Sequence, residues 1–66
     1  MDKELVALRS FYLNVRDDLA HLDQRELNTL LALAYSALSE KRWGDCQGLI
    51  DSMTDRLEEL GHSFNY

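Results

Sequence analysis

Apolar side chains recur every three or four residues along almost the whole chain, and no proline interrupts them. This spacing matches the 3.6 residues of an α-helical turn, so each such segment is expected to bury one face of a helix. Proline would remove a helical hydrogen bond, and its absence leaves long helices uninterrupted. The sequence therefore predicts an all-α fold, either a three-helix bundle or a helical hairpin plus one helix, over about residues 3–21, 24–41 and 44–60.

The 66 residues are enough for one small helical domain, which covers residues 1–66. Gly61 follows the last apolar residue of the third segment, and a left-handed glycine commonly ends a helix at such a position. We expect residues 62–66 to form a frayed C-terminal tail, unless Phe64 or Tyr66 folds back onto the bundle.

The first predicted helix carries one main apolar stripe and one thinner line. The main stripe consists of Leu5, Leu8, Phe11, Tyr12, Val15, Leu19 and Leu22. The thinner line consists of Val6, Leu13 and Ala20, which are seven residues apart and are separated from the main stripe by Arg9 and Arg16. Heptad spacing is found in self-associating helices, although single apolar residues are also common on the surfaces of monomers.

The second predicted helix begins after the sequence DQRE, Asp23 to Glu26, which is a capping-box variant with aspartate in place of serine or threonine. The Asp23 carboxylate would accept a hydrogen bond from the Glu26 amide, and the Glu26 side chain would reach back to Asp23. A start at this point leaves only a residue or two between the first two helices. They are therefore expected to form an antiparallel hairpin or a sharp corner.

The second helix is the central element of the predicted fold. Its apolar residues cover an arc of roughly 200°, whereas the stripes of the other two helices cover roughly 120° each. The arc consists of Leu27, Leu30, Leu31, Leu33, Ala34, Tyr35, Ala37 and Leu38. A central helix that contacts two neighbours needs a wide arc, so one interpretation places all of it inside the bundle. In the other interpretation, Leu31, Tyr35 and Leu38 contact another molecule.

The third predicted helix has one apolar face and one acidic face. The apolar face consists of Trp43, Cys46, Leu49, Ile50, Met53, Leu57 and Leu60, and the acidic face of Asp51, Asp55, Glu58 and Glu59. Cys46 is the only cysteine, so no internal disulfide can form. Its place on the apolar face predicts a small core residue rather than a reactive thiol.

From Leu30 onward, the spacing of large and small residues resembles one tetratricopeptide-repeat hairpin. The matching residues are Leu30, Leu33, Ala34 and Ala37 on the first helix of the hairpin, then Trp43, Cys46, Ile50 and Met53 on the second. The small residues Ala34 and Cys46 would let the two helices approach closely. The match covers about half of the chain in one copy; it departs from the family at Lys41, where a small residue is usual, and at its end, which lacks proline. The resemblance implies a concave, peptide-holding surface lined by Asn28, Leu31, Tyr35, Leu38 and Ser39.

Charge and composition limit the functions to be considered. The formal net charge is −5 and the cations are scattered, which disfavours direct nucleic-acid binding. The charged N-terminus lacks the apolar core of a signal peptide and no stretch is long enough to span a bilayer, so we expect a cytoplasmic protein without membrane contact. We expect no metal, no cofactor and no enzymatic activity, because His21, His62 and Cys46 are dispersed and a domain of this size has little volume for a cleft. Gly44 and Gly48 fit turn and packing roles rather than a phosphate-binding loop.

The leading functional prediction is a small acidic protein-interaction module, such as an adaptor, co-chaperone or regulator, that holds a partner's amphipathic helix. The predicted binding residues are Asn28, Leu31, Tyr35, Leu38 and Ser39, with Tyr12 and Trp43 at the edge. Small acidic helical chaperones of bacterial secretion systems are similar in size and charge. Two alternatives are an obligate homodimer, to which Val6, Leu13 and Ala20 contribute, and an acidic inhibitor of a nucleic-acid-binding protein.

Overall fold

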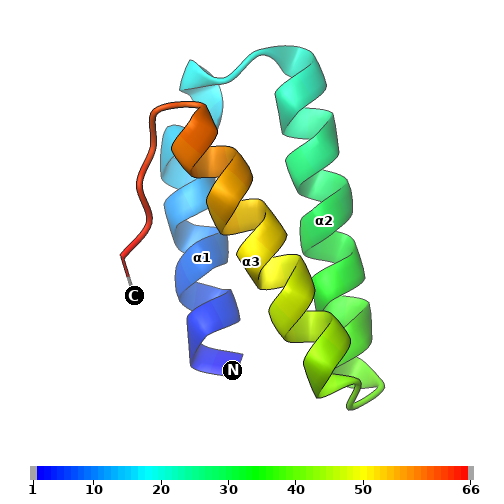
Figure 1. The fold of residues 1–66 in the computed structure, drawn as a ribbon. Helices are drawn as coiled ribbons and strands as arrows, with labels where there is room; N and C mark the ends of the chain where they lie inside the picture. The colour runs from blue at the N-terminus through cyan, green and yellow to red at the C-terminus, as the bar shows by residue number, and fades with distance from the viewer. Residues whose placement is uncertain (1, 66) are drawn as a thin grey trace.

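The computed structural model describes residues 2–65, which form a three-helix bundle and include no strand. The elements are α1 (Asp2–Val15), the short 3₁₀ helix η1 (Arg16–Asp18), α2 (His21–Ser39) and α3 (Trp43–Glu59). In Figure 1, α1 and α2 run in opposite directions, and α3 lies in front of them. The predicted all-α fold and its three helices are confirmed.

One core fills the space between the three helices. Its buried side chains are Leu5, Leu8, Tyr12, Leu19, Leu27, Ala34, Ala37, Cys46, Ile50, Met53 and Leu57. The small residues Ala34 and Cys46 are both fully buried, as expected where two helices approach closely. Cys46 is a buried core residue, as predicted. This burial raises the pKa of its thiol, so the thiol stays protonated at neutral pH.

The first helix is shorter than predicted, because it ends at Val15 instead of reaching residue 21. The side-chain amide of Gln24 explains part of this difference. It donates hydrogen bonds to the carbonyl oxygens of Arg16 (3.0 Å) and Leu19 (3.1 Å), which a continuing helix would have used internally. The two aspartates of η1 add to the effect, since negative charge is unfavourable near a helix C-terminus.

The capping-box prediction for the second helix is wrong. α2 begins at His21, and its N-cap residue, Ala20, makes no side-chain capping hydrogen bond. Asp23 and Glu26 instead bind the guanidinium of Arg56 on α3, at 2.9 and 2.7 Å. Hydrogen bonds between ionised partners are stronger than those to a neutral amide, so these two carboxylates join α2 to α3 rather than cap α2.

The third helix agrees with the prediction to within one residue at each end. Gly61 ends it in the left-handed conformation (φ 92°), as predicted. The amide of His62 donates to the Leu57 carbonyl oxygen at 2.9 Å and closes the last turn. Before α3, Lys41 also adopts a left-handed φ of 59°, which helps the chain to reverse after Ser39.

The chain after α3 returns along α1 without regular secondary structure. The ring of Phe64 lies 5.3 Å from the ring of Phe11, centroid to centroid, at an interplanar angle of 49°. Both rings pack against the core. This is the folded-back alternative to a frayed tail; Tyr66, the other residue considered for it, lies outside the described residues.

Leu22 of the predicted first stripe belongs to α2 and is 73% exposed. Tyr12 of the same stripe is fully buried, so it does not lie at the edge of a binding surface as the functional prediction expects. Its hydroxyl donates to the side-chain oxygen of Asn28 at 2.7 Å and lies 3.1 Å from the carbonyl oxygen of Gln24. A buried hydroxyl needs such a partner, and this contact joins α1 to α2.

Candidate functional site

The two sides of α2 face different neighbours. On one side, Asn28 accepts the hydrogen bond of Tyr12 from α1. On the other side, Asp23 and Glu26 bind Arg56 from α3. The apolar arc of α2 is therefore shared between an α1 side and an α3 side.

Most of the predicted binding residues lie on the α1 side of α2. Leu31, Tyr35 and Leu38 follow Asn28 at helical spacings that keep them near its side of the helix. All three are partly buried and pack against the core. Asn28 itself is exposed, but its side-chain oxygen is occupied by Tyr12. This side of α2 is therefore partly covered from within the chain.

Three of the predicted binding residues come together at one end of the bundle. Leu38, Ser39 and Trp43 line a hollow of about 610 Å³ with Asp2 and Lys41. The Trp43 side chain is 51% exposed, so an aromatic surface is available there. The hollow lies where the start of α1, the end of α2 and the start of α3 meet.

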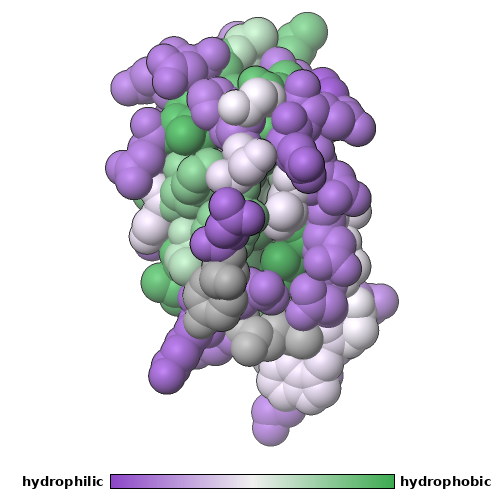
Figure 2. All heavy atoms as spheres, turned by 60° about the vertical axis from the view of Figure 1, so that its left-hand side comes forward, coloured by the Kyte–Doolittle hydropathy of each residue, from purple (hydrophilic) through white to green (hydrophobic). Residues whose placement is uncertain are grey.

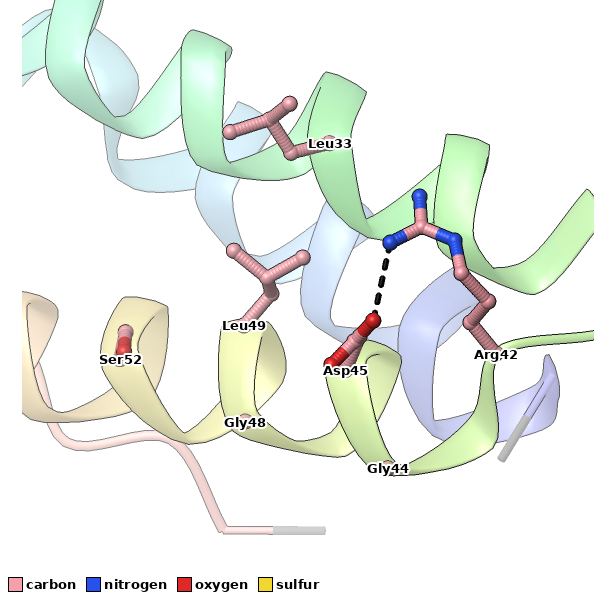
Figure 3. A pocket seen from close by; sticks show the side chains of 7 residues that line it. All are labelled: Leu33, Arg42, Gly44, Asp45, Gly48, Leu49 and Ser52. Carbon is pink, nitrogen blue, oxygen red and sulfur yellow. Dashed lines mark hydrogen bonds and ion pairs between the residues drawn. The ribbon is translucent and has the colours of Figure 1, made fainter. Parts of the chain in front are cut away.

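A longer depression lies on the α3 side of α2, and we call it the α2–α3 groove. Its first part has a volume of about 420 Å³ and is lined by Leu33, Arg42, Gly44, Asp45, Gly48, Leu49 and Ser52. Figure 3 shows Leu33 of α2 opposite Leu49 of α3, with the hydrogen-bonded pair Arg42–Asp45 at one end. Leu33 is 48% exposed, so an apolar side chain of the groove remains open to water.

The groove continues along α3 toward its C-terminal end. The second part, of about 380 Å³, is lined by Glu26, Leu30, Ser52, Asp55, Arg56 and Glu59. Ser52 belongs to both parts, so they adjoin. The two parts together follow most of the length of α3, with leucines toward the middle and charged residues at both ends.

Gly44 and Gly48 leave bare backbone on the α3 wall of the groove. A Cβ atom built on either residue would meet no atom of the surrounding described chain within 4 Å. Neither glycine has a positive φ, since Gly61 is the only glycine of residues 2–65 that does. Nothing in the described chain therefore requires glycine at these two positions, although glycine inside a helix costs about 1 kcal/mol relative to alanine.

An arginine is held by carboxylates at each end of the groove. Arg56 contacts Asp23, Glu26 and Glu59 at 2.9, 2.7 and 3.1 Å. The hydrogen bond that Arg56 donates to Glu59 is the largest of the effects that raise the pKa of Arg56.

At the other end, Arg42 contacts Glu40 and Asp45, each at 2.9 Å. The hydrogen bond that Arg42 donates to Asp45 is the main cause of the raised pKa of Arg42. All three of these side chains are about half exposed or more, so water screens the pairs and their partners can be exchanged.

The outer face of α1 offers less for binding. Val6 and Leu13 are 49% and 46% exposed, but Ala20, the third member of the heptad line, is not part of α1. Figure 2, which brings the α1 side of the bundle forward, shows hydrophobic side chains interspersed with hydrophilic ones. The predicted line of three residues is thus reduced to two on one helix.

The sequence prediction missed the α2–α3 groove. It places Leu33 and Leu49 in apolar stripes and assigns turn and packing roles to Gly44 and Gly48. The available signal is the spacing of the two glycines, which are four residues apart and so share one face of a helix.

Neither a metal site nor a membrane span is found in the described residues. No group of three or more His, Cys, Asp or Glu within residues 2–65 is arranged to hold a metal ion. None of the helices in this range is long and apolar enough to cross a bilayer. The chain matches no protein-family model, no curated protein and no solved structure, so the tetratricopeptide-repeat resemblance stays a prediction.

Proposed function

We propose that this protein is a non-catalytic protein-interaction module whose α2–α3 groove holds one amphipathic helix. The observation that supports this most directly is the groove itself, in which half-exposed Leu33 lies beside the bare backbone of Gly44 and Gly48. An apolar side chain open to water favours burial by a partner.

A helix suits this groove better than an extended peptide does. Extended peptides commonly bind by adding to a sheet edge, and the described residues contain no strand to which one could add. Ridges of side chains on one helix fit the grooves between those of another, and glycines allow the two backbones to come closest. Leu33 and Leu49 would contact the apolar face of the docked helix, and Arg42 and Arg56 would lie near its ends.

The proposed partner is still an amphipathic helix, as predicted from the sequence, but it binds on a different side of α2. Leu31, Tyr35 and Leu38 lie near the side of α2 on which Asn28 contacts Tyr12 of α1, whereas Leu30 and Leu33 lie on the α3 side. The binding surface is still part of the wide apolar arc of α2. Trp43 and Ser39, at the end of the bundle, are not part of the groove lining.

Site-specific photo-crosslinking in the native cell tests this proposal. A benzophenone amino acid in place of Leu33 is expected to give a discrete covalent adduct after irradiation. The matched control carries the same group in place of Asn14, which is exposed on α1. Equal or absent adducts from the two positions would refute a docking groove, and mass spectrometry of the adduct shows whether the other molecule is a different protein or this chain.

A further inference from the structure

The two ends of the α2–α3 groove differ in charge. At the end near Arg56, four carboxylates accompany a single guanidinium: those of Asp23, Glu26, Asp55 and Glu59. At the opposite end, Lys41 and Arg42 balance Glu40 and Asp45. Of these four residues only Arg42 and Asp45 line the groove, so the groove runs from a strongly acidic end to an end where Arg42 balances Asp45.

A groove with this polarity is complementary to itself when one copy is turned by 180°. A two-fold axis through the middle of the groove brings the acidic end of each copy onto the end of the other that carries Arg42. Because a two-fold interface repeats every contact, each favourable charge pair occurs twice. A parallel arrangement would instead place the two acidic ends together, which like-charge repulsion opposes.

We propose that the helix held in the α2–α3 groove is α3 of a second copy of this chain, antiparallel to the first and crossing it near Gly48. This inference rests on the proposed function and names its partner. Residues equally distant from Gly48 face each other in such a pair, so Gly44 meets Ser52 of the second copy. By the same rule Arg42 faces Thr54 of the second copy, so it lies one residue away from that copy's Asp55, and the symmetric contact repeats this.

The groove lining fits this arrangement. Gly48 on the axis leaves room for close approach of two α3 backbones, since a Cβ there has no neighbour within 4 Å in the single chain. Leu33 and Leu49 line the groove in each copy, so in the pair these four leucines contact one another and are buried from water. Antiparallel α3 helices also place the negative C-terminal end of one dipole near the positive N-terminal end of the other.

The specific pairs between Arg42 and Asp55 are needed because each chain carries a net charge of −5. Two such chains repel each other at long range, and only a matched distribution of charges offsets this at contact. Arg42 is exposed and held by exposed carboxylates, so it can exchange Glu40 or Asp45 for Asp55 of the second copy. The pairing is therefore expected to depend on both residues.

Charge reversal tests the register. Arg42→Asp sets acid against Asp55 at both symmetry-related contacts, and Asp55→Arg sets cations against Arg42. Each variant alone is expected to dimerise about tenfold more weakly than the wild type, because two pairs change from attractive to repulsive. An equimolar mixture of the two variants restores both attractive pairs, so it is expected to form a heterodimer about as stable as the wild-type dimer.

The mixture separates contacts between copies from effects within one chain. Arg42 and Asp55 are thirteen residues apart, about 20 Å along α3, so they cannot contact each other in the monomer. Sedimentation velocity, from sub-micromolar to millimolar protein, measures the association, and circular dichroism verifies that each variant is folded. Association of the mixture, but not of its components, would support the antiparallel pair.

Two results would overturn this inference. A wild-type chain that remains monomeric at every concentration excludes a second copy as the docked helix. A dimer that the mixture does not restore excludes the register with Gly48 at the axis. In either case, a Leu33 adduct with a different protein would still support the proposed function, whereas a monomer without any such adduct would refute both.

Discussion

Replacing Gly48 with alanine is expected to make the folded chain more stable and its self-association weaker. The two effects have opposite signs because they come from different states. In the monomer, the new methyl group lies in open space, since nothing in the surrounding described chain is within 4 Å of it. In the proposed dimer, two such methyl groups meet at the axis and push the helices apart.

The size of the first effect follows from the position of Gly48. It lies inside α3 in ordinary helical conformation, where alanine is about 0.8–1.0 kcal/mol more favourable than glycine. No steric penalty has to be subtracted, because the position is open. A gain of about 1 kcal/mol corresponds to a rise in Tm of about 4–8 °C for a domain of this size.

Gly61 provides the matched control. Its φ of 92° lies in the left-handed region, which costs a residue with a side chain about 1–2 kcal/mol. Gly61→Ala should therefore lower stability, although it is the same chemical change in an equally open place. Comparing Gly48→Ala with Gly61→Ala therefore separates the effect of backbone conformation on stability from the effect of the space available to the new methyl group.

Urea denaturation followed by circular dichroism, at a concentration below self-association, measures the free energy of unfolding of both variants. Sedimentation velocity at high concentration then measures the dimer of Gly48→Ala. A loss of stability in Gly48→Ala would refute the argument that the groove leaves this position open. Unchanged association in a stabilised variant would refute the crossing at Gly48.

Two further predictions concern the contacts that join the helices. Tyr12→Phe should lower the free energy of unfolding by about 1–1.5 kcal/mol, because the side-chain oxygen of Asn28 loses its 2.7 Å partner. Burial raises the pKa of Tyr12 above its ordinary value of 10.0, so the wild type should lose stability as the pH rises above 10.0 and through the folded-state pKa, and denaturation curves of Tyr12→Phe should lack this contribution. Arg56→Met should lower the urea midpoint more than Arg42→Met does, because Arg56 joins α2 to α3 whereas the partners of Arg42 lie within three residues of it. Equal midpoints for these two arginine variants, or a difference that persists in high salt, would contradict this.

The helical core could be predicted from the sequence because it follows from spacing alone. Leu5, Leu8, Ile50 and Leu57 recur with the helical period and are buried as expected. The end of α3 was also predictable, since Gly61 meets a requirement of the backbone at that point. These features depend on neighbours in the sequence, which the sequence displays directly.

The helix starts and ends that were predicted wrongly depend on residues distant in the sequence. Asp23 and Glu26 have the spacing of a capping box, but Arg56 of α3 binds both. Gln24 helps to end the first helical segment by hydrogen bonding to the carbonyl of Arg16. In each case a tertiary contact replaces the local hydrogen bond that the sequence pattern implies. The pattern of one segment does not show which distant residue will make that contact.

The position of the groove depends on the same kind of distant contact. Leu31 and Leu33 are equivalent in the sequence of α2, since both are leucines of one apolar arc. Leu31 packs against the core, whereas Leu33 remains 48% exposed. Leu33 lines the groove with Gly44 and Gly48 of α3, neither of which carries a side chain. Exposure of an apolar residue therefore depends on the residues that lie around it in space, and the pattern of α2 alone does not show which residues of α3 those are.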